Sequence, residues 1–256
     1  FSTTFYLNLY CNNTSFIEYC TSHMVNAFLS RSAGLFTLAT IAARSAQGFI
    51  VPIIATSNTL NRLQSSSSSE MGEKHVLVPI GDGSEEIETT CITDTLTRFG
   101  AKVTVASVMS ERNVCTMSRG IKIMADMSIE DAAKKEWDLI ALPGGMPGAE
   151  HLRDSKELID LLKKQNEAKK PYGAVCAAPA VVLASNDLAT EGATCYPAPP
   201  FRATLSNPSD DDVVVKDNLI TSQGPGTSLK FALMLGEQLY GKEKADEIAN
   251  AMLVQR

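Results

Sequence analysis

One cysteine lies where the hydrophobic pattern predicts that a strand ends and a helix begins. It is Cys176, within residues 173–179 (GAVCAAP), and its neighbours on both sides are small. Small residues let the backbone turn sharply, as it does at the nucleophile elbow of hydrolases. A thiol at the N-terminus of a helix faces the positive end of the helix dipole, which favours the thiolate. We therefore interpret Cys176 as a candidate nucleophile rather than as a buried structural cysteine.

A glycine-rich loop follows the preceding predicted strand. Residues 142–148 read LPGGMPG, and glycines let the backbone approach a ligand closely. Alone, the motif is also typical of a tight turn. Next to Cys176, the N–H groups of Gly145 and Ala177 would together form an oxyanion hole.

An acidic segment supplies the third candidate. Residues 83–88 (GSEEIE) lead from the first predicted strand into its helix. Glu85 and Glu86 are interpreted as ordinary acidic residues at a helix N-terminus, whereas Glu88 lies one turn further and would point at the thiol. An ionised Glu88 raises the thiol pKa by like-charge repulsion, and a protonated Glu88 lowers it by donating a hydrogen bond. The two groups would then titrate as a coupled unit.

The elements that must position these residues follow an α/β pattern, because short apolar runs alternate with amphipathic segments after residue 74. The order predicts one doubly wound domain, a mainly parallel sheet sandwiched by helices, with ligands bound beyond the carboxyl ends of the strands. Strands are expected at 76–80, 102–108, 138–142, 173–175, 213–215 and 219–221, with a hairpin near 114–124. Helices are expected at 85–99, after Ser128, at 227–240 and at 242–254.

The chain has two unlike parts. Residues 1–70 contain three arginines, two glutamates and no lysine, a net charge of +1, and the total of −6 leaves −7 for residues 71–256. A run of five serines (65–69) reads as a flexible linker. We therefore predict a leader or non-native extension over residues 1–70 and one folded domain over residues 71–256.

The N-terminal part has features of a targeting segment. An arginine precedes the modest apolar run 35–43, small residues follow it, and acidic residues are scarce. The alternative is that translation starts at Met71. The protein would be cytoplasmic in the second case, whereas organellar or secretory targeting fits a genuine leader. The apolar run is too short for a transmembrane anchor, so no membrane association is expected.

Several other functions are disfavoured by the sequence. The acidic balance argues against nucleic-acid binding. The six cysteines show no CxxC spacing, so neither a zinc site nor a disulfide framework is expected. His75 and His151 are assigned to a strand start and a surface helix. The three aspartates at 210–212 are interpreted as a solvated turn, and residues 224–228 (GPGTS) would cradle an anion but lack the lysine of a P-loop.

Taken together, the motifs resemble the DJ-1 branch of the DJ-1/PfpI (ThiJ) superfamily. The resemblance covers about residues 74–256 and rests on EEIET (85–89), LPGG (142–145), AVCA (174–177) and GPGTS (224–228). It implies that Cys176 is an oxidation-prone nucleophile, Glu88 its carboxyl partner, and Gly145 and Ala177 the amide donors, with no cofactor or metal. It also implies a homodimer, with Asp94, Arg98 and Arg119 at or near the interface.

Three departures from the family pattern affect the expected chemistry. Ala177 follows the cysteine where the protease-like branch has histidine, so peptidase activity is disfavoured. Tyr196 stands where many DJ-1 relatives have histidine, and tyrosine, with a reference pKa of about 10, does not act as a base at neutral pH as histidine does, which assigns base chemistry to Glu88. Met124 replaces an interface cysteine of some relatives.

The resemblance leaves two main functional hypotheses. The first is a cofactor-independent glyoxalase or deglycase activity on small α-oxoaldehydes and their adducts. The second is a redox sensor or chaperone-like regulatory protein, in which an oxidant converts Cys176 to the sulfinate and a protein partner responds. A cysteine hydrolase is the third and weakest alternative.

Overall fold

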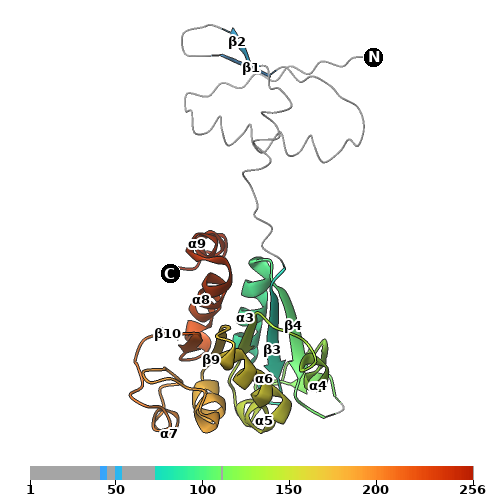
Figure 1. Cartoon of the computed structure of the whole chain (residues 1–256), viewed down its shortest axis with the longest axis vertical. Coiled ribbons are helices and arrows are strands. Elements are labelled where there is room, and N and C mark those ends of the chain that lie inside the picture. The colour runs from blue at the N-terminus through green and yellow to red at the C-terminus, as the bar shows by residue number, and fades with distance from the viewer. Residues whose placement is uncertain (1–40, 45–49, 54–72, 111, 256) are drawn as a thin grey trace. The chain divides into compact units, whose positions relative to one another are not determined.

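The computed structural model describes residues 41–44, 50–53, 73–110 and 112–255 (Figure 1). The chain divides into two units, residues 1–70 and 71–256. In the first unit, β1 (Ile41–Arg44) pairs with β2 (Ile50–Ile53) in antiparallel fashion. The remainder of the predicted leader, including the serine run, lies outside the described residues, so its role stays a prediction.

The second unit is built on a seven-stranded sheet with the order β10-β11-β9-β8-β3-β4-β7 (Figure 1). Its pairs are parallel except for the antiparallel edge pair of β10 and β11. The strands are β3 (His75–Ile80), β4 (Lys102–Ser107), β7 (Met127–Ser128), β8 (Leu139–Leu142), β9 (Tyr172–Val175), β10 (Val213–Lys216) and β11 (Leu219–Ser222). This confirms the predicted mainly parallel α/β fold.

Helices cover both faces of the sheet. They are α3 (Glu86–Arg98), α4 (Ile129–Ala132), α5 (Gly148–Asp154), α6 (Lys156–Glu167), α7 (Pro199–Arg202), α8 (Ser228–Tyr240) and α9 (Lys242–Ala251). The predicted hairpin is present as β5 (Val114–Thr116) and β6 (Lys122–Met124). Within the described parts of the chain, no helix is long and apolar enough to cross a bilayer.

Alternate residues of the central strands supply two cores, because successive side chains of a strand point to opposite faces. Leu77 packs with residues of α4, α5 and α6 on one face. Val76 and Val78 pack with Ile92 of α3 and Phe231 of α8 on the other. Strands covered on both faces read as continuous apolar runs, which explains the pattern at residues 76–80.

Most elements begin or end one or more residues away from the predicted bounds. Strand β4 ends at Ser107 rather than Val108. Helix α8 begins at Ser228 rather than Thr227, after a short 3-10 turn, Pro225–Thr227. The final helix ends at Ala251 rather than Val254, because Leu253 adopts a positive φ of 58° that a helix cannot contain.

The sheet order places the three sequence motifs side by side. Strands β3, β8 and β9 are neighbours, and each precedes one motif: the acidic segment, the glycine loop or Cys176. The carboxyl ends of neighbouring parallel strands lie at the same edge of the sheet. The topology therefore brings together residues that are more than 80 positions apart in sequence at the edge where doubly wound folds bind ligands.

Candidate active site

Cys176 occupies a sharp turn directly after β9. Its φ is +64°, a conformation that is uncommon for a residue other than glycine. Two main-chain hydrogen bonds hold it there: its N–H donates to the Ser222 carbonyl at 3.0 Å, and its carbonyl accepts from the N–H of Tyr196 at 2.8 Å. The residue is half-buried.

The carboxyl group of Glu88 is fully buried in the first turn of α3. Its Oε2 accepts a hydrogen bond of 2.6 Å from the N–H of Gly144, while Oε1 is buried without a conventional hydrogen-bond partner. Burial raises the pKa of Glu88 to about 7, although the Gly144 N–H and the Cys176 thiol act in the opposite direction. The side chain therefore changes protonation state near neutral pH.

The thiol of Cys176 interacts with this carboxyl group and with two backbone amides. Burial raises the pKa of Cys176, and so do the charge of Glu88 and the hydrogen bond between the two side chains. The N–H groups of Gly145 and Ala177 act in the opposite direction, and the resulting pKa is about 12. A protonated Glu88 removes the like-charge repulsion and offers an O–H donor. The thiolate is thus favoured when the shared proton resides on Glu88, and the pair titrates as one unit.

The expected effect of a helix dipole on the thiol is outweighed. The chain continues from Cys176 into a π-helical turn, Pro179–Leu183, instead of a regular α-helix. Burial and the neighbouring carboxylate dominate, so the net shift of the thiol pKa is upward rather than downward. The backbone N–H groups at this turn act in the direction predicted for a helix N-terminus, but burial and the Glu88 charge, which was also expected to raise the thiol pKa, outweigh them.

The glycine loop passes so close to Cys176 that a side chain would not fit. A Cβ atom on Gly144 would lie 2.8 Å from the backbone N of Ala177 and 2.8 Å from the Cβ of Cys176. Gly145 has a φ of +85°, and a Cβ there would lie 2.5 Å from the Gly83 carbonyl oxygen. Both glycines are required by close backbone approach, which brings the Gly145 N–H to the thiol.

The structure thus brings together Cys176, Glu88, Gly145 and Ala177. Glu85 and Glu86 lie at the N-terminus of α3, as predicted, and the structure adds that both are buried. Glu85 caps α3, because its carboxylate accepts from the N–H of Glu88 at 2.8 Å. This contact was detectable as an acidic residue three positions before Glu88, a typical capping interval.

Glu86 joins α3 to the β5–β6 hairpin. Its carboxylate accepts from the Ser118 hydroxyl at 2.8 Å and from the N–H of Arg119 at 2.7 Å. Burial opposes ionisation, yet these hydrogen bonds lower the pKa of Glu86 overall. No local sequence signal identified this partner, because it lies more than 30 residues further along the chain.

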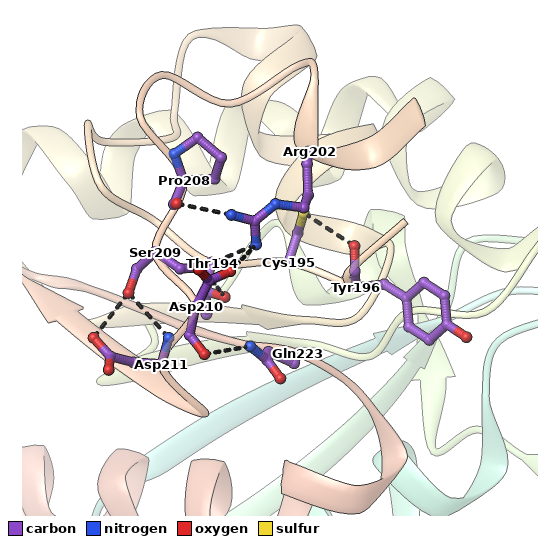
Figure 2. Close-up of polar contacts among 9 residues, drawn as sticks. All are labelled: Thr194, Cys195, Tyr196, Arg202, Pro208, Ser209, Asp210, Asp211 and Gln223. Atoms are coloured by element: carbon purple, nitrogen blue, oxygen red, sulfur yellow. Dashed lines mark hydrogen bonds and ion pairs between the residues drawn. The ribbon is translucent and has the colours of Figure 1, made fainter. Parts of the chain in front are cut away.

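Tyr196 lies beside the turn, on the loop that follows the π-helical segment. Besides its main-chain hydrogen bond to Cys176, its ring packs edge-to-face on Phe201, with centroids 6.2 Å apart and an interplanar angle of 84°. Figure 2 shows the ring pointing away from Cys195 and from the polar cluster around Arg202. Cys195 itself is buried, and its Sγ contacts the Tyr196 carbonyl oxygen at 3.4 Å.

The other sequence candidates lie apart from this constellation or have structural partners. His75 begins β3, at the opposite end of that strand from the acidic segment, and its N–H donates to Asp138. In the GPGTS segment, Thr227 and Ser228 direct their hydroxyls to the backbone of Gly224, so these groups are not available to cradle an anion. The described residues contain no group of three or more histidine, cysteine or acidic side chains able to hold a metal ion.

The model of the DJ-1/PfpI family matches residues 74–238, most of the domain that carries this site. The chain belongs to the DJ-1/PfpI family. It is similar to Protein DJ-1 homolog B of Arabidopsis thaliana, with 45% identity over 197 residues that cover 77% of this chain and 45% of the relative. The chain spans about half the length of the Arabidopsis relatives it matches.

Two further comparisons place the chain in the DJ-1 branch of the family. It is 37% identical over 175 residues to the Glutathione-independent glyoxalase DJR-1.2 of Caenorhabditis elegans, covering 68% of this chain and 91% of the relative. The solved structure titled "Toxoplasma gondii DJ-1, oxidized" aligns with a TM-score of 0.68 and 41% identity, covering 72% of this chain and all of that one. The sequence-based assignment to the DJ-1 branch is therefore confirmed.

Proposed function

We propose that the protein is a cofactor-independent glyoxalase or deglycase, which converts small α-oxoaldehydes and their adducts to α-hydroxy acids. The observation that carries this proposal is the placement of the Cys176 thiol between a buried carboxyl group, whose pKa of about 7 suits a proton shuttle, and two backbone N–H groups. A family relative named as a glutathione-independent glyoxalase supports the same reaction class.

The first chemical step is addition of sulfur to the aldehyde carbon. Glu88 takes the thiol proton, a bond forms between Sγ and the aldehyde carbon, and the carbonyl π electrons move to oxygen. The N–H groups of Gly145 and Ala177 stabilise the resulting oxyanion. Protonation of that oxygen by Glu88 gives a hemithioacetal and returns Glu88 to its carboxylate form.

The second step is an internal redox change that needs no external oxidant. The Glu88 carboxylate removes the proton from the former aldehyde carbon, and the adjacent ketone oxygen gains a proton, which gives an enediol. A proton is then added to the former ketone carbon while the hydroxyl on the former aldehyde carbon loses its proton and becomes a carbonyl, which produces an α-hydroxy thioester. Water then cleaves the bond between carbon and sulfur, which releases the hydroxy acid and restores the thiol. Methylglyoxal plus water thereby gives lactate.

The direct test is turnover by the purified protein without added glutathione. Loss of methylglyoxal, followed by its absorbance after derivatisation, should match the appearance of lactate mole for mole. Failure to form lactate in protein whose Cys176 is verified by mass spectrometry as the free thiol would contradict the proposal. Ala177 and Tyr196 stand where a histidine base would serve a cysteine hydrolase, so hydrolysis remains the weaker alternative.

A redox sensor is a second candidate, and a specific feature favours it. The Glu88 Oε1 atom is buried without a conventional hydrogen-bond partner. An oxidised Cys176 sulfinate would add acceptor oxygens beside it, and a protonated Glu88 would donate to one of them. The amides that serve the oxyanion in the enzymatic proposal would serve the sulfinate equally, and a protein partner would respond to the changed surface.

We predict that mild hydrogen peroxide adds two oxygen atoms to Cys176 before it modifies the other cysteines of the domain. Cys115 and Cys195 are buried. Cys91 is partly exposed, as Cys176 is, but burial and the nearby acidic charges raise its thiol pKa, whereas two backbone N–H groups counteract the rise at Cys176. Peptide mapping after a peroxide titration measures the order of oxidation. Equal or earlier oxidation of Cys91 would count against a sensor role for Cys176.

The proposed assembly is a homodimer built on α3 and the β5–β6 hairpin. Three exposed apolar side chains, Ile87, Ile121 and Met124, lie on these elements, and Met124 is 75% exposed. Glu86 holds the hairpin against α3, which makes the two elements one surface. Asp94 and Arg98 form an exposed ion pair on the same helix.

We expect the substitution Ile121→Glu to weaken self-association at least about tenfold, because it places a charge within an apolar contact. Sedimentation velocity over a range of protein concentrations measures the change. The matched control is Leu253→Glu, which alters a side chain that is 92% exposed near the C-terminal end of the chain. Unchanged association of the Ile121 variant would place the interface elsewhere.

A further inference from the structure

A surface cavity of about 660 Å³ lies at the amino ends of the central strands. Two of its lining residues, His75 and Lys102, begin β3 and β4, and a third, Trp137, comes shortly before β8. The motif around Cys176 follows the carboxyl end of β9 instead, and the length of β3 separates the two ends of the sheet by about 17 Å. The cavity is therefore distinct from the candidate active site, and its volume suits a small-molecule ligand.

One lining residue carries a hydroxyl group without a partner. Thr104 belongs to β4, where it pairs with Leu77 of β3, and it is only 7% exposed. Its side-chain hydroxyl forms no hydrogen bond with any residue that the structure describes. Leaving such a group unpaired in a largely buried position costs free energy. Because Thr104 lines the cavity, a ligand with a hydrogen-bond acceptor can supply the missing partner.

Three basic side chains line the same cavity. Lys102 and Lys135 are exposed, and neither forms an ion pair within the described part of the chain. His75 adds an imidazole ring, whose Nε2 lies 3.8 Å from the Glu73 carboxylate. Ammonium groups donate strong, charge-assisted hydrogen bonds to carboxylates and phosphates. The two lysines thus offer unpaired positive charge to an anionic ligand.

The two acidic side chains of the cavity wall already have partners. Asp126 accepts a hydrogen bond of 2.8 Å from the backbone N–H of Val105. The Glu136 side chain is 93% exposed and pairs with Lys170 at 2.9 Å. Glu136 is therefore neutralised from outside the cavity, and the lysines outnumber the remaining carboxylate. The charge balance favours an anion over a cation.

The rest of the wall is apolar. Trp137 is 4% exposed, and its indole N–H already donates to the Ala132 carbonyl at 3.0 Å, so it presents ring atoms rather than a hydrogen-bond donor. Val103 and Met127 are partly buried hydrophobic residues on the same wall. Aromatic rings and the flexible methionine side chain pack well against a flat apolar group.

We infer that this cavity is a binding site for a small organic anion, a carboxylate or phosphate attached to an aromatic or other apolar body. Lys102 and Lys135 bind the anionic group, and the Thr104 hydroxyl donates a hydrogen bond to it. Trp137 and Met127 pack against the apolar body. This ligand is separate from the substrate of the proposed function, because the cavity lies at the other end of the strands.

The test is calorimetric titration of the full chain with two probes, 3-phenylpropionate and phenyl phosphate. The controls are 3-phenylpropionamide, which keeps the ring and lacks the charge, and acetate, which keeps the charge and lacks the ring. We expect at least one phenyl anion to bind with a Kd of about 1 mM or below, and at least about tenfold more tightly than either control. The tighter of the two phenyl anions identifies the preferred anionic group.

Fluorescence then locates the bound probe, because Trp137 is the only tryptophan of the chain. Its selectively excited emission should change saturably, with the same Kd as the calorimetric titration. Absence of saturable binding by both phenyl anions, or equal binding of the anion and its matched control, would overturn the inference.

Variants assign the binding to the cavity. Lys102→Gln and Lys135→Gln should each raise the Kd for the preferred anion about threefold to tenfold, and Thr104→Val, which keeps the shape of the side chain, should raise it about fivefold. The matched control is Lys216→Gln, which removes an exposed lysine on the edge strand β10 and should leave the Kd within about twofold of the wild type. Wild-type affinity in both Lys102→Gln and Thr104→Val would place the anion elsewhere and refute the site.

Discussion

Substitution of Cys176 by alanine is expected to abolish methylglyoxal consumption, with kcat/KM reduced at least about a thousandfold. The reason is chemical: no other group at the site can form the hemithioacetal, and Glu88 then has no bound carbon from which to remove a proton. Cys176→Ser should be nearly as inactive, because a hydroxyl has a far higher pKa than a thiol and a carboxylate with a pKa near 7 cannot deprotonate it effectively.

The measurement is initial-rate consumption of methylglyoxal together with lactate formation, at equal protein concentration and after a check of folding by circular dichroism. The matched control is Cys91→Ala, which removes another partly exposed thiol of the same domain. Activity should remain with that control. Undiminished lactate formation by folded Cys176→Ala would refute covalent catalysis at this residue.

Substitution of Glu88 by glutamine should reduce kcat by about a hundredfold to ten-thousandfold, the usual contribution of a positioned acid–base group. The amide oxygen of glutamine can still accept the Gly144 N–H, so the fold around the loop is retained. In the wild type, activity should fall as the pH drops through about 7, because protonation of both Glu88 and the thiol leaves no base. This acid limb should be absent from the residual activity of Glu88→Gln.

The same substitution should change the pH dependence of stability. The folded-state pKa of Glu88 is about 7, above the value of 4.5 that represents the unfolded chain. Between these two pH values the folded protein binds more protons at Glu88 than the unfolded chain does. The contribution of Glu88 to stability is therefore greatest below pH 4.5 and falls as the pH rises toward 7. Linkage gives this contribution as about 3 kcal/mol in the free energy of unfolding.

Urea unfolding of the wild type and of Glu88→Gln at pH 5, 6, 7 and 8 gives the free energy of unfolding at each pH. The effect is the difference between the two proteins in how steeply that free energy falls as the pH rises. Glu88→Gln should lose the decline that Glu88 causes, whatever its absolute stability. Glu191→Gln, an exposed glutamate in a turn, serves as the control and should follow the wild type. Parallel pH profiles for the wild type and Glu88→Gln would show that Glu88 ionises as readily in the folded protein as in the unfolded chain.

The strands and the order of the motifs were predictable because their signals are local. Apolar runs such as residues 76–80 identify strands covered on both faces, and glycines or small residues mark the turns after them. Since parallel strands place their carboxyl ends at one edge, the sequence alone predicts that the three segments around Glu88, Gly145 and Cys176 form one site. Element ends such as those near residues 107 and 251 were less predictable, because they depend on single backbone angles.

The electrostatic state of that site was not predictable, because it depends on burial and on contacts between distant segments. Full burial of Glu88 raises its pKa, and the same burial together with the Glu88 charge reverses the shift expected for Cys176 from a helix N-terminus. Glu86 looked like an ordinary acidic residue at a helix start, but its partners are in the hairpin more than 30 residues away.

The sequence by itself determined the family, the fold class and the four residues proposed for the chemistry. The family and the residues follow from short motifs at the ends of predicted strands, and the fold class follows from the order of strands and helices. Only the tertiary structure decided which carboxylates are buried and which groups surround the thiol. The physical reason is that residue type and spacing specify local conformation, whereas desolvation, charge interaction and the shape of a subsite arise when segments distant in sequence are packed together.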